Sequence, residues 1–407
     1  MPLGRRRVVV TGLGAVSPAG VGVGATWAGL LAPAPAERLR TVDDAALEPL
    51  LAQRLQVRDR RRMDRFAQLA VVAAGEALEA AGLLGDTGQV GPGVDTDRVA
   101  VVIGTGLAGL PSFAANAVAR AERGERRVSP YTVPMVMPNA AAAAVSLTFA
   151  TGGPCEAVTT ACAAGAHSIA HAARLVAWGL ADLAVAGGAE SCLDPTTIAG
   201  FANMTALSSS GVSRPFDRAR DGFCAAEGAG VLVLESLESA TARGARILME
   251  VLAAGSSADA HHLTAPRPDG VGAVRCLHAA LREAGLAGSD VVHVNAHGTS
   301  TPLNDAAEAS ALRAVLGDAD GRVTAPVTSI KGVTGHSLGA AGAIEAVAVA
   351  LSIEHATLPP TAGTTDVDPE LGLDVVLAAR NWSPGPVLSN SFGFGGHNAT
   401  LLLAPPS

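Results

Sequence analysis

Positive charge is scarce in this sequence, and lysine is almost absent. The 407 residues include 28 arginines but only one lysine, Lys331, and 29 basic side chains stand against 37 acidic ones. The formal net charge of −8 excludes a general nucleic-acid-binding protein, because phosphate contacts need a broad excess of arginine and lysine. Keeping one lysine in an arginine-rich chain indicates a need for a compact ammonium donor at that position.

Cysteine and long hydrophobic runs are also scarce. Five cysteines at irregular spacing, without a C-x-x-C pair, predict reduced thiols in the cytoplasm rather than a disulfide framework or a zinc site. Asp182 and Glu345 interrupt the best apolar stretches before they reach the ~18 residues of a membrane span. Near the start, arginines precede an apolar run as in a signal peptide, but Gly12 and Pro18 break that run. We therefore expect a cytoplasmic protein with no membrane contact and a buried first strand.

The residues that are abundant follow a pattern typical of α/β proteins. Hydrophobic residues make up 49% of the chain, enough for a large core, and 47 glycines favour tight connections between strands and helices. The pattern restarts near residue 245, which predicts two similar halves, residues 1–245 and 246–407. The expected elements are a helix over 60–81, strands over 99–104, 157–161 and 182–187, then strand 247–255, helix 273–286, strand 291–298 and helix 305–317.

Cys162 is the first candidate for a reactive group. The letters "AVTTA" read as a strand and "AAGAHSIAHAARL" as the helix that follows, so the thiol is expected at a helix N-terminus. Unpaired N–H groups and the helix dipole stabilise a thiolate there and lower a pKa that is ~8.5 in a free cysteine. Small neighbours such as Ala161 and Gly165 leave space for a substrate. From the residues alone, a reactive nucleophile and a small buried cysteine beside a turn are both open.

Two histidines and the single lysine follow apolar strands in the second half. The stretch "VNAHGTSTP" places His297 after a strand, and "SIKGVTGHS" does the same for Lys331 and His336. Side chains at strand ends are the ones that α/β folds deliver to a binding crevice. These three residues are therefore candidates for the same site.

The stretch "KGVTGHSLG" also contains G-x-S-x-G, the pattern that presents a serine nucleophile in α/β-hydrolases. A triad of Ser337, Asp366 or Asp368, and His397 would follow hydrolase chain order. The polar "KGVT" separates the preceding strand from the motif, which fits a nucleophile turn poorly. A serine hydrolase nevertheless stays open as an alternative function.

Two further patterns are too weak to predict a cofactor. "GTGLAG" matches G-x-G-x-x-G after a strand, but Pro111 follows where the helix of a dinucleotide site should be running. His167 and His171 have the spacing of paired metal ligands, but Ser168 stands between them where a metalloprotease helix has glutamate, and no third ligand is evident. We predict neither a nucleotide cofactor nor a metal.

Seven motifs together resemble one family. "VVVTGLGAVSP", "TTACAAGAHSIAHAAR", "ADLAVAGGAES", "SRPFDRARDGF", "NAHGTSTPLND", "IKGVTGHSLGAAGAIE" and "NSFGFGGHNA" occur in order from end to end of the chain. In this order and spacing they resemble the elongating β-ketoacyl-acyl carrier protein synthases of type II systems, condensing enzymes of the thiolase-like superfamily. The resemblance implies a five-layered αβαβα fold with two similar halves and an active site assembled from both.

The resemblance also implies roles for the candidate residues. Cys162 would be the nucleophile that takes an acyl chain as a thioester, and His297 and His336 would hydrogen-bond the malonyl thioester carbonyl during decarboxylation. Lys331 matches the family lysine, and Glu308 matches the acid that helps to hold it. No metal or other cofactor is implied.

Pocket and surface residues follow from the same resemblance. Phe394 in "GFGG" matches the family's gating phenylalanine, and its N–H group, with that of Cys162, would receive the acyl oxyanion. Leu107 and Thr132 are expected at the acyl pocket. The arginines that match the family's docking surface for the acidic carrier protein are Arg61, Arg62, Arg126 and Arg127.

The implied partners are an acyl carrier protein and a second subunit, which would be either another copy of this chain or a chain-length-factor-like protein. Cys162 argues against a chain-length factor, where glutamine is usual, although a catalytically silent partner subunit stays open. Departures at Ala163-Ala164, at Thr132 and in the early loop "APAPAERLRTVDD" favour polyketide over fatty acid biosynthesis.

Overall fold

The computed structural model describes residues 5–407, and the strands of both halves join at β1 (Val8–Ser17). β1 pairs antiparallel with β8 (Gly228–Ser236) of the first half and with β9 (Met249–Ala258) of the second. The strand order along the whole sheet is β5-β4-β6-β8-β1-β9-β16-β15-β10-β11-β13. The remaining bounds are β5 Cys155–Glu156, β4 Val99–Gly104, β6 Leu183–Glu190, β16 His397–Ala404, β15 Val387–Gly393, β10 His293–Asn295, β11 Val323–Thr328 and β13 Leu373–Val375.

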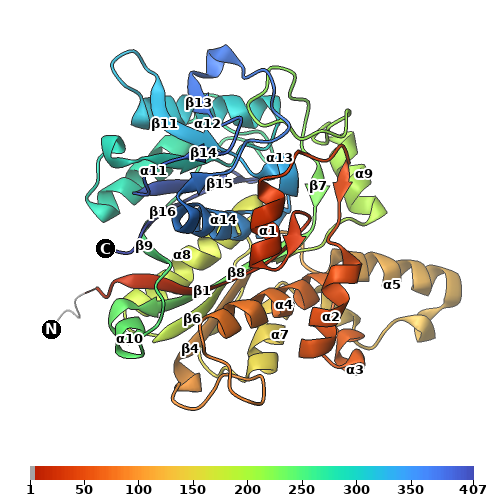
Figure 1. Cartoon of the computed structure of the whole chain (residues 1–407). Helices are drawn as coiled ribbons and strands as arrows, with labels where there is room; N and C mark the ends of the chain where they lie inside the picture. The colour runs from red at the N-terminus through yellow and green to blue at the C-terminus, as the bar shows by residue number, and fades with distance from the viewer. Residues whose placement is uncertain (1–4) are drawn as a thin grey trace.

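Helices cover both faces of each half. Together with the two layers of strands they form the five layers of the fold (Figure 1). α4 (Arg65–Ala80) and α7 (Ala140–Phe149) cover the outer face of the first half. α8 (Ala164–Ala177) and α14 (Ala341–His355) lie between the two sets of strands. α11 (Val271–Ala284) and α12 (Pro302–Leu316) cover the outer face of the second half. The αβαβα fold expected from the resemblance is confirmed.

The two central helices are apolar around most of their circumference because strands pack on both sides of them. The segment Leu338–His355 is long and apolar enough to cross a membrane, but 89% of it is buried inside the protein. Its small residues allow close packing: Gly342 lies so near Ala166 of α8 that a Cβ atom there would lie 3.0 Å from that residue's Cβ. This segment is therefore a core helix.

Most expected elements are found, with shifted ends. β4 matches its expected bounds, and β6 is longer than expected because pairing with β8 continues to Glu190. The helix expected over 60–81 begins at Arg65, because Asp64 caps it by accepting a hydrogen bond from the N–H of Phe66 at 3.2 Å. The prediction of a strand over 157–161 is wrong. Strand pairing with β4 ends at Glu156, and the next residues lead to a 3₁₀ turn without forming a strand.

Shorter elements complete the fold and include a small parallel pair beside the second half. β3 (Leu39–Arg40) pairs with β7 (Ala225–Ala226). The predicted boundary at residue 245 falls in the connection between α10 and β9. A division of the chain into two domains at this residue remains a prediction. The other elements are α1 Val23–Leu30, α2 Asp44–Arg54, α3 Val57–Arg60, α5 Leu110–Arg123, α6 Thr132–Val136, α9 Pro195–Asn203, α10 Leu237–Ala242, α13 Lys331–Thr334, β2 Gly20–Val21, β12 Thr357–Leu358 and β14 Arg380–Asn381.

Candidate active site

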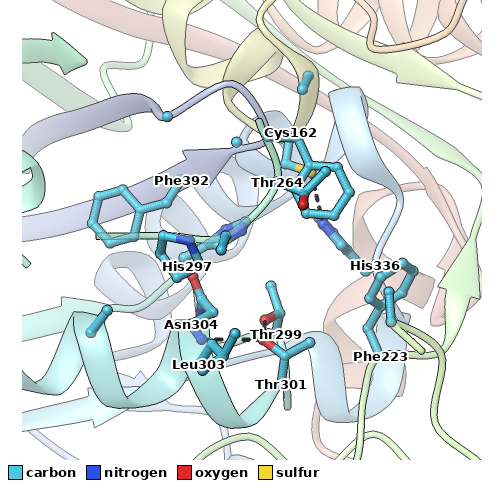
Figure 2. A pocket seen from close by; sticks show the side chains of 18 of the residues that line it. Cys162, Phe223, Thr264, His297, Thr299, Thr301, Leu303, Asn304, His336 and Phe392 are labelled. Atoms are coloured by element: carbon cyan, nitrogen blue, oxygen red, sulfur yellow. Dashed lines mark hydrogen bonds between the residues drawn. The ribbon is translucent and has the colours of Figure 1, made fainter. Parts of the chain in front are cut away.

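A cavity of about 670 Å³ lies between the halves and brings together three of the predicted residues. Cys162 comes from the 3₁₀ turn before α8, His297 from the segment after β10, and His336 from the turn after α13. The Cys162 sulfur and one ring nitrogen of each histidine all lie within 4.8 Å of one another. Figure 2 shows the thiol above, with the two imidazoles on either side of the cavity. Two histidines more than a hundred residues after Cys162 thus meet at its thiol.

Backbone strain and a glycine set the position of Cys162. Ala161, directly before it, adopts the left-handed conformation with φ of 50°, which a residue with a Cβ atom rarely does. The thiol side chain then lies at the start of α8, at the N-terminal position expected from the sequence. Gly393 of β15 packs on this turn, since a Cβ atom there would lie 3.1 Å from the Cys162 nitrogen and 2.7 Å from the Thr160 carbonyl oxygen.

The pKa expected for Cys162 needs correction. Burial raises the pKa of the thiol to about 12, since only 7% of the residue is exposed. The Lys331 charge and the N–H group of Phe394 act in the opposite direction but are outweighed. The helix N-terminus therefore positions the thiol without making it a thiolate in the free protein. The contact with Phe394 N–H is consistent with its predicted place at the acyl oxygen.

His336 faces the thiol and is held through its backbone. Its Nε2 lies 3.1 Å from the Cys162 sulfur, while its Nδ1 is buried without a hydrogen-bond partner within residues 5–407. A proton on Nδ1 would be an orphaned buried donor, so the tautomer with the proton on Nε2 is favoured. Burial, with the nearby Lys331 charge, lowers the pKa of His336 well below its usual value. The ring is thus neutral and presents an N–H group to the cavity.

Lys331 fixes the tautomer of His297. The ammonium is 1% exposed and has three acceptors, namely the Glu345 carboxylate, the His297 carbonyl oxygen at 2.5 Å and His297 Nδ1 at 3.4 Å. Because an ammonium only donates, Nδ1 must accept and the proton of the neutral ring sits on Nε2. Burial first, and then the charge of Lys331, lower the pKa of His297 well below its usual value. Both imidazoles are therefore neutral donors.

The predicted contact of Glu308 with Lys331 is wrong, and Glu345 is the ion-pair partner. Glu308 instead accepts the backbone N–H groups of His297 at 2.9 Å and Gly298 at 2.8 Å, and the Asn390 side-chain amide at 3.2 Å. It therefore fixes the loop that carries His297. Glu345 was visible in the sequence as an acid with apolar neighbours on both sides, a position that favours a buried cation as partner.

Comparison with known proteins identifies the family. The model of the beta-ketoacyl synthase N-terminal domain matches residues 36–240, and that of the C-terminal domain matches residues 248–365. The chain belongs to the beta-ketoacyl synthase family. The family predicted from the seven motifs is confirmed, and the synthase is an acyltransferase of the ketosynthase type.

Relatives match the synthase over nearly its whole length. It is 42% identical over 413 residues to "3-oxoacyl-[acyl-carrier-protein] synthase 2" of Staphylococcus aureus strain N315, covering 98% of each chain. Among solved structures it is similar to the ishigamide ketosynthase/chain length factor, with a TM-score of 0.88, 34% identity and 99% and 100% coverage of the two chains. It is also similar to a type II polyketide synthase structure of an acyl-carrier protein in complex with its hexaketide-bound ketosynthase, with a TM-score of 0.87, 30% identity and the same coverage.

The synthase places only some of the expected pocket residues at the cavity. Leu107 and Phe394 line it, together with the apolar side chains of Phe201, Met204 and Leu338. Thr132 does not line the cavity of the single chain: it begins α6, where its hydroxyl donates to the Ser129 carbonyl oxygen at 2.8 Å. The predicted docking residues Arg61, Arg62, Arg126 and Arg127 are all exposed, and Arg62 lies over the Tyr131 ring, 5.0 Å from its centre.

Glu190 is a buried acid of the synthase that sequence reasoning missed. Its carboxylate accepts hydrogen bonds from the N–H groups of Gly106 at 2.6 Å and Gly339 at 3.2 Å, and from Leu107 N–H. It thereby joins the loop after β4 to the turn before α14, beside the cavity. The glycine pattern around Gly106 was noticed for its similarity to a nucleotide site, but the carboxylate occupies its amides. No nucleotide site is formed there.

The residues of the alternative serine triad are not assembled in the synthase. Ser337 is 2% exposed and precedes a 3₁₀ turn, whereas Asp366 and Asp368 form ion pairs with Arg218 and Arg220. His397 lines a different hollow, shared with the two histidines of α8. Within residues 5–407 no hydrogen bond links Ser337 to an acid or a histidine.

The two α8 histidines have separate partners. His167 Nδ1 lies 2.9 Å from the Thr160 hydroxyl, and His171 Nε2 lies 2.7 Å from Glu156. Among residues 5–407, the one group of three or more side chains with atoms close enough to hold a metal ion is Cys162, His297 and His336, and it includes neither α8 histidine.

Proposed function

We propose that the synthase extends acyl chains on an acyl carrier protein by two carbons, with Cys162 as nucleophile and His297 and His336 as hydrogen-bond donors. The observation that carries the proposal is the convergence of one thiol and two neutral imidazoles within 4.8 Å, with Lys331 fixing one imidazole as a donor. The serine hydrolase alternative lacks an acid or histidine hydrogen-bonded to Ser337 in the described residues, whereas this site brings a thiol and two imidazoles together.

The first step is transfer of an acyl group to Cys162. The Cys162 sulfur displaces the carrier-protein thiol from the acyl thioester, and that thiol leaves with the proton that Cys162 loses. The N–H groups of Cys162 and Phe394 receive the oxyanion that forms at the acyl carbonyl. The apolar side chains of Phe201, Met204 and Leu338 accept the chain. Covalent capture divides one difficult condensation into two easier steps.

The second step is decarboxylation of a malonyl thioester. Loss of carbon dioxide places negative charge on the thioester oxygen, and the Nε2–H groups of His297 and His336 are preplaced to donate to it. Such a donor is typically worth ~10²–10³ in rate, because it stabilises charge that exists only in the transition state and the enolate. Neutral imidazoles suit this role, since they donate without first having to be protonated.

The third step joins the two groups. The enolate carbon attacks the acyl carbonyl on Cys162, the sulfur leaves as a thiolate and takes up a proton, and the product is a β-ketoacyl thioester on the carrier protein. Thr299, Thr301 and Asn304 form a polar wall below the thiol and imidazoles (Figure 2), where they can hydrogen-bond the polar arm that carries the thioester.

The partners of this reaction are an acidic carrier protein and a second subunit. Support comes from the solved complex of a type II polyketide carrier protein with its ketosynthase and from the exposed arginines at positions 61, 62, 126 and 127. The second subunit would be a copy of this chain or a chain-length factor, as in the ishigamide structure. The site of action would be the cytoplasm. Thr132 lies outside the cavity of the single chain, so a part for it in choosing the acyl chain would depend on the second subunit.

The test is mass spectrometry of the intact synthase after incubation with carrier proteins that bear acyl chains of different length and oxidation state. Acyl mass on the wild type but not on Cys162→Ala supports the proposal, and the preferred chain indicates the pathway. Cys162→Gln should release carbon dioxide from malonyl-carrier protein without condensation. Acyl transfer to Cys162→Ala, or ester hydrolysis that is lost only in Ser337→Ala, would contradict the proposal. Absence of any acyl mass would indicate a silent subunit.

A further inference from the structure

Arg40 is the largest fully buried side chain of the described residues, at 1% exposure, and it forms no ion pair there. Within residues 5–407 it contacts the Cys224 side chain and donates hydrogen bonds to main-chain carbonyl oxygens. They reach Gly332 at 2.6 Å, Val333 at 2.7 Å and Pro35 at 3.1 Å, with longer contacts to Glu37 at 3.4 Å and Lys331 at 3.5 Å. A buried guanidinium neutralised by no carboxylate is costly, so a folding role alone accounts poorly for it.

The carbonyl oxygens that Arg40 binds belong to the short helix just before His336. α13 runs from Lys331 to Thr334, and the last carbonyls of a helix lack partners within the helix itself. Arg40 Nη1 donates to the carbonyl oxygens of Gly332 and Val333, while Nη2 and Nε reach Pro35 and Glu37 in the early loop. A lysine ammonium, as a single point of donation, cannot span both segments in this way. Arg40 Nη1 thus holds in place the segment between Lys331 and His336.

The stem of Arg40 also contacts the turn into His336. Gly335 has φ of +68°, and a Cβ atom there would lie 3.1 Å from Arg40 Cδ and 2.9 Å from both the Ala226 side chain and the Cys224 carbonyl oxygen. The turn is thus closed on three sides.

Main-chain pairing connects the same residues a second time. Arg40 pairs with Ala226 in the β3–β7 ladder, and His336 extends that ladder on the other side of β7. The His336 N–H donates to the Cys224 carbonyl oxygen at 2.8 Å, and the Ala226 N–H donates to the His336 carbonyl oxygen at 3.0 Å. The early loop is therefore an outer strand of the small sheet that holds the imidazole.

We propose that Arg40 is a positioning residue for the reaction, one that holds the Nε2–H of His336 at the place where the enolate oxygen forms. This inference rests on the proposed function, because it assigns Arg40 an effect only through the donor role of His336. It gives the early loop, the segment where the chain departs from the family pattern, a part in the chemistry.

The experiment measures decarboxylation of malonyl-carrier protein, by mass spectrometry of the acetyl product, in wild type, Arg40→Met and Arg40→Lys. A displacement of about 1 Å in a catalytic donor can cost ~10² in rate. We expect kcat of Arg40→Met to fall by ~10- to 100-fold with KM changed less than about twofold, because the donation is realised in the transition state. The kcat of Arg40→Lys should lie between those of the wild type and Arg40→Met. Arg174→Met, which removes another guanidinium bound to a carbonyl oxygen, should match the wild type.

A double-mutant cycle separates positioning from loss of structure. In a His336→Ala background the donor is gone, so Arg40→Met should lower the residual kcat by less than about twofold, whereas in a His297→Ala background it should keep its full effect. Equal losses in all three backgrounds, or an Arg40→Met enzyme as fast as wild type, would overturn the inference. A wild type that releases no carbon dioxide would instead overturn the proposed function. Circular dichroism of each variant reports the folded fraction, so that each rate is expressed per folded enzyme.

Discussion

Lys331 Nζ lies 2.5 Å from the carbonyl oxygen of His297 and 3.4 Å from Nδ1 of the same residue, so one ammonium binds both the backbone and the ring of a histidine that we propose to be catalytic. The remaining donor goes to Glu345, and all three residues are at most 2% exposed. The ammonium therefore determines which nitrogen of His297 carries the proton. Its role is distinct from that of a group that touches substrate.

Lys331→Met should lower kcat of decarboxylation by ~10², about the worth of one oxyanion donor, because His297 would then be free to place its proton on Nδ1. KM should change little. Glu345→Gln leaves the ammonium with its two His297 acceptors and should cost less. Kinetics on malonyl-carrier protein would check this, and a Lys331→Met enzyme within threefold of wild type would contradict it.

Alkylation of Cys162 should accelerate steadily with pH. Because burial raises the pKa of the thiol to about 12, its thiolate fraction should grow ~tenfold per pH unit from pH 6 to 10. The measurement is the iodoacetamide rate at Cys162, followed by peptide mass spectrometry, with free cysteine as the control because its rate levels off above ~8.5. A plateau near pH 8 at Cys162 would show that the helix N-terminus outweighs burial.

Gly393→Ala should abolish acyl loading with little change in overall fold. The added methyl group would meet the Cys162 nitrogen at 3.1 Å and the Thr160 carbonyl oxygen at 2.7 Å, and both belong to the turn that presents the thiol. The control is Gly200→Ala, since no heavy atom lies within 4 Å of a Cβ atom there. Intact-mass analysis would report loading, and circular dichroism the fold. Wild-type loading by Gly393→Ala would show that the turn can move away.

Stability should fall as the pH drops below the ordinary pKa of histidine. Burial lowers the pKa of His293 to about 3, and the pKa values of His297 and His336 are also lowered. The unfolded chain then binds protons that the folded chain excludes, so each such group costs about 2 kcal/mol by pH 5 and almost nothing above pH 7. Urea unfolding at pH 7 and pH 5 would measure this. His293→Gln should show a smaller loss, and an equal loss would exclude His293 as a source.

Reversing charge at Arg126 and Arg127 should slow reaction with the carrier protein. Substitution of both by glutamate replaces attraction of an acidic partner with repulsion, and we expect kcat/KM for acyl-carrier protein to fall ~10-fold or more at low salt. The difference should shrink as ionic strength rises, because exposed charges are screened. A small-molecule acyl thioester should react at the wild-type rate. Unchanged kinetics with carrier protein would move the docking surface elsewhere.

Sequence reasoning singled out Cys162, His297 and His336 because each follows an apolar segment, although the strand expected just before Cys162 is not formed. The five layers of the fold were expected from the family resemblance. Sequence reasoning failed where a contact depends on segments that the sequence does not place side by side. The pairing of Glu345 with Lys331, and the reach of Arg40 to a helix almost three hundred residues later, are of this kind.

The wrong pKa prediction for Cys162 has a different origin. The helix N-terminus was located correctly, but the depth of burial around the thiol depends on the packing of both halves. Desolvation then outweighs the favourable N–H groups. Local sequence can locate a dipole, whereas it cannot show how much water remains beside it.

The position of β1 between the two halves also matters while the chain is being made. Val8 pairs with Ser236 and Val251, so a ribosome must add every residue between them before this strand finds its neighbours. At ordinary rates of translation that delay is roughly 10 to 50 s. For that time β1 lacks its two long neighbouring strands, although β2 and α4 are already available to it. The charges of the arginines at positions 5–7, directly before this apolar strand, oppose its aggregation.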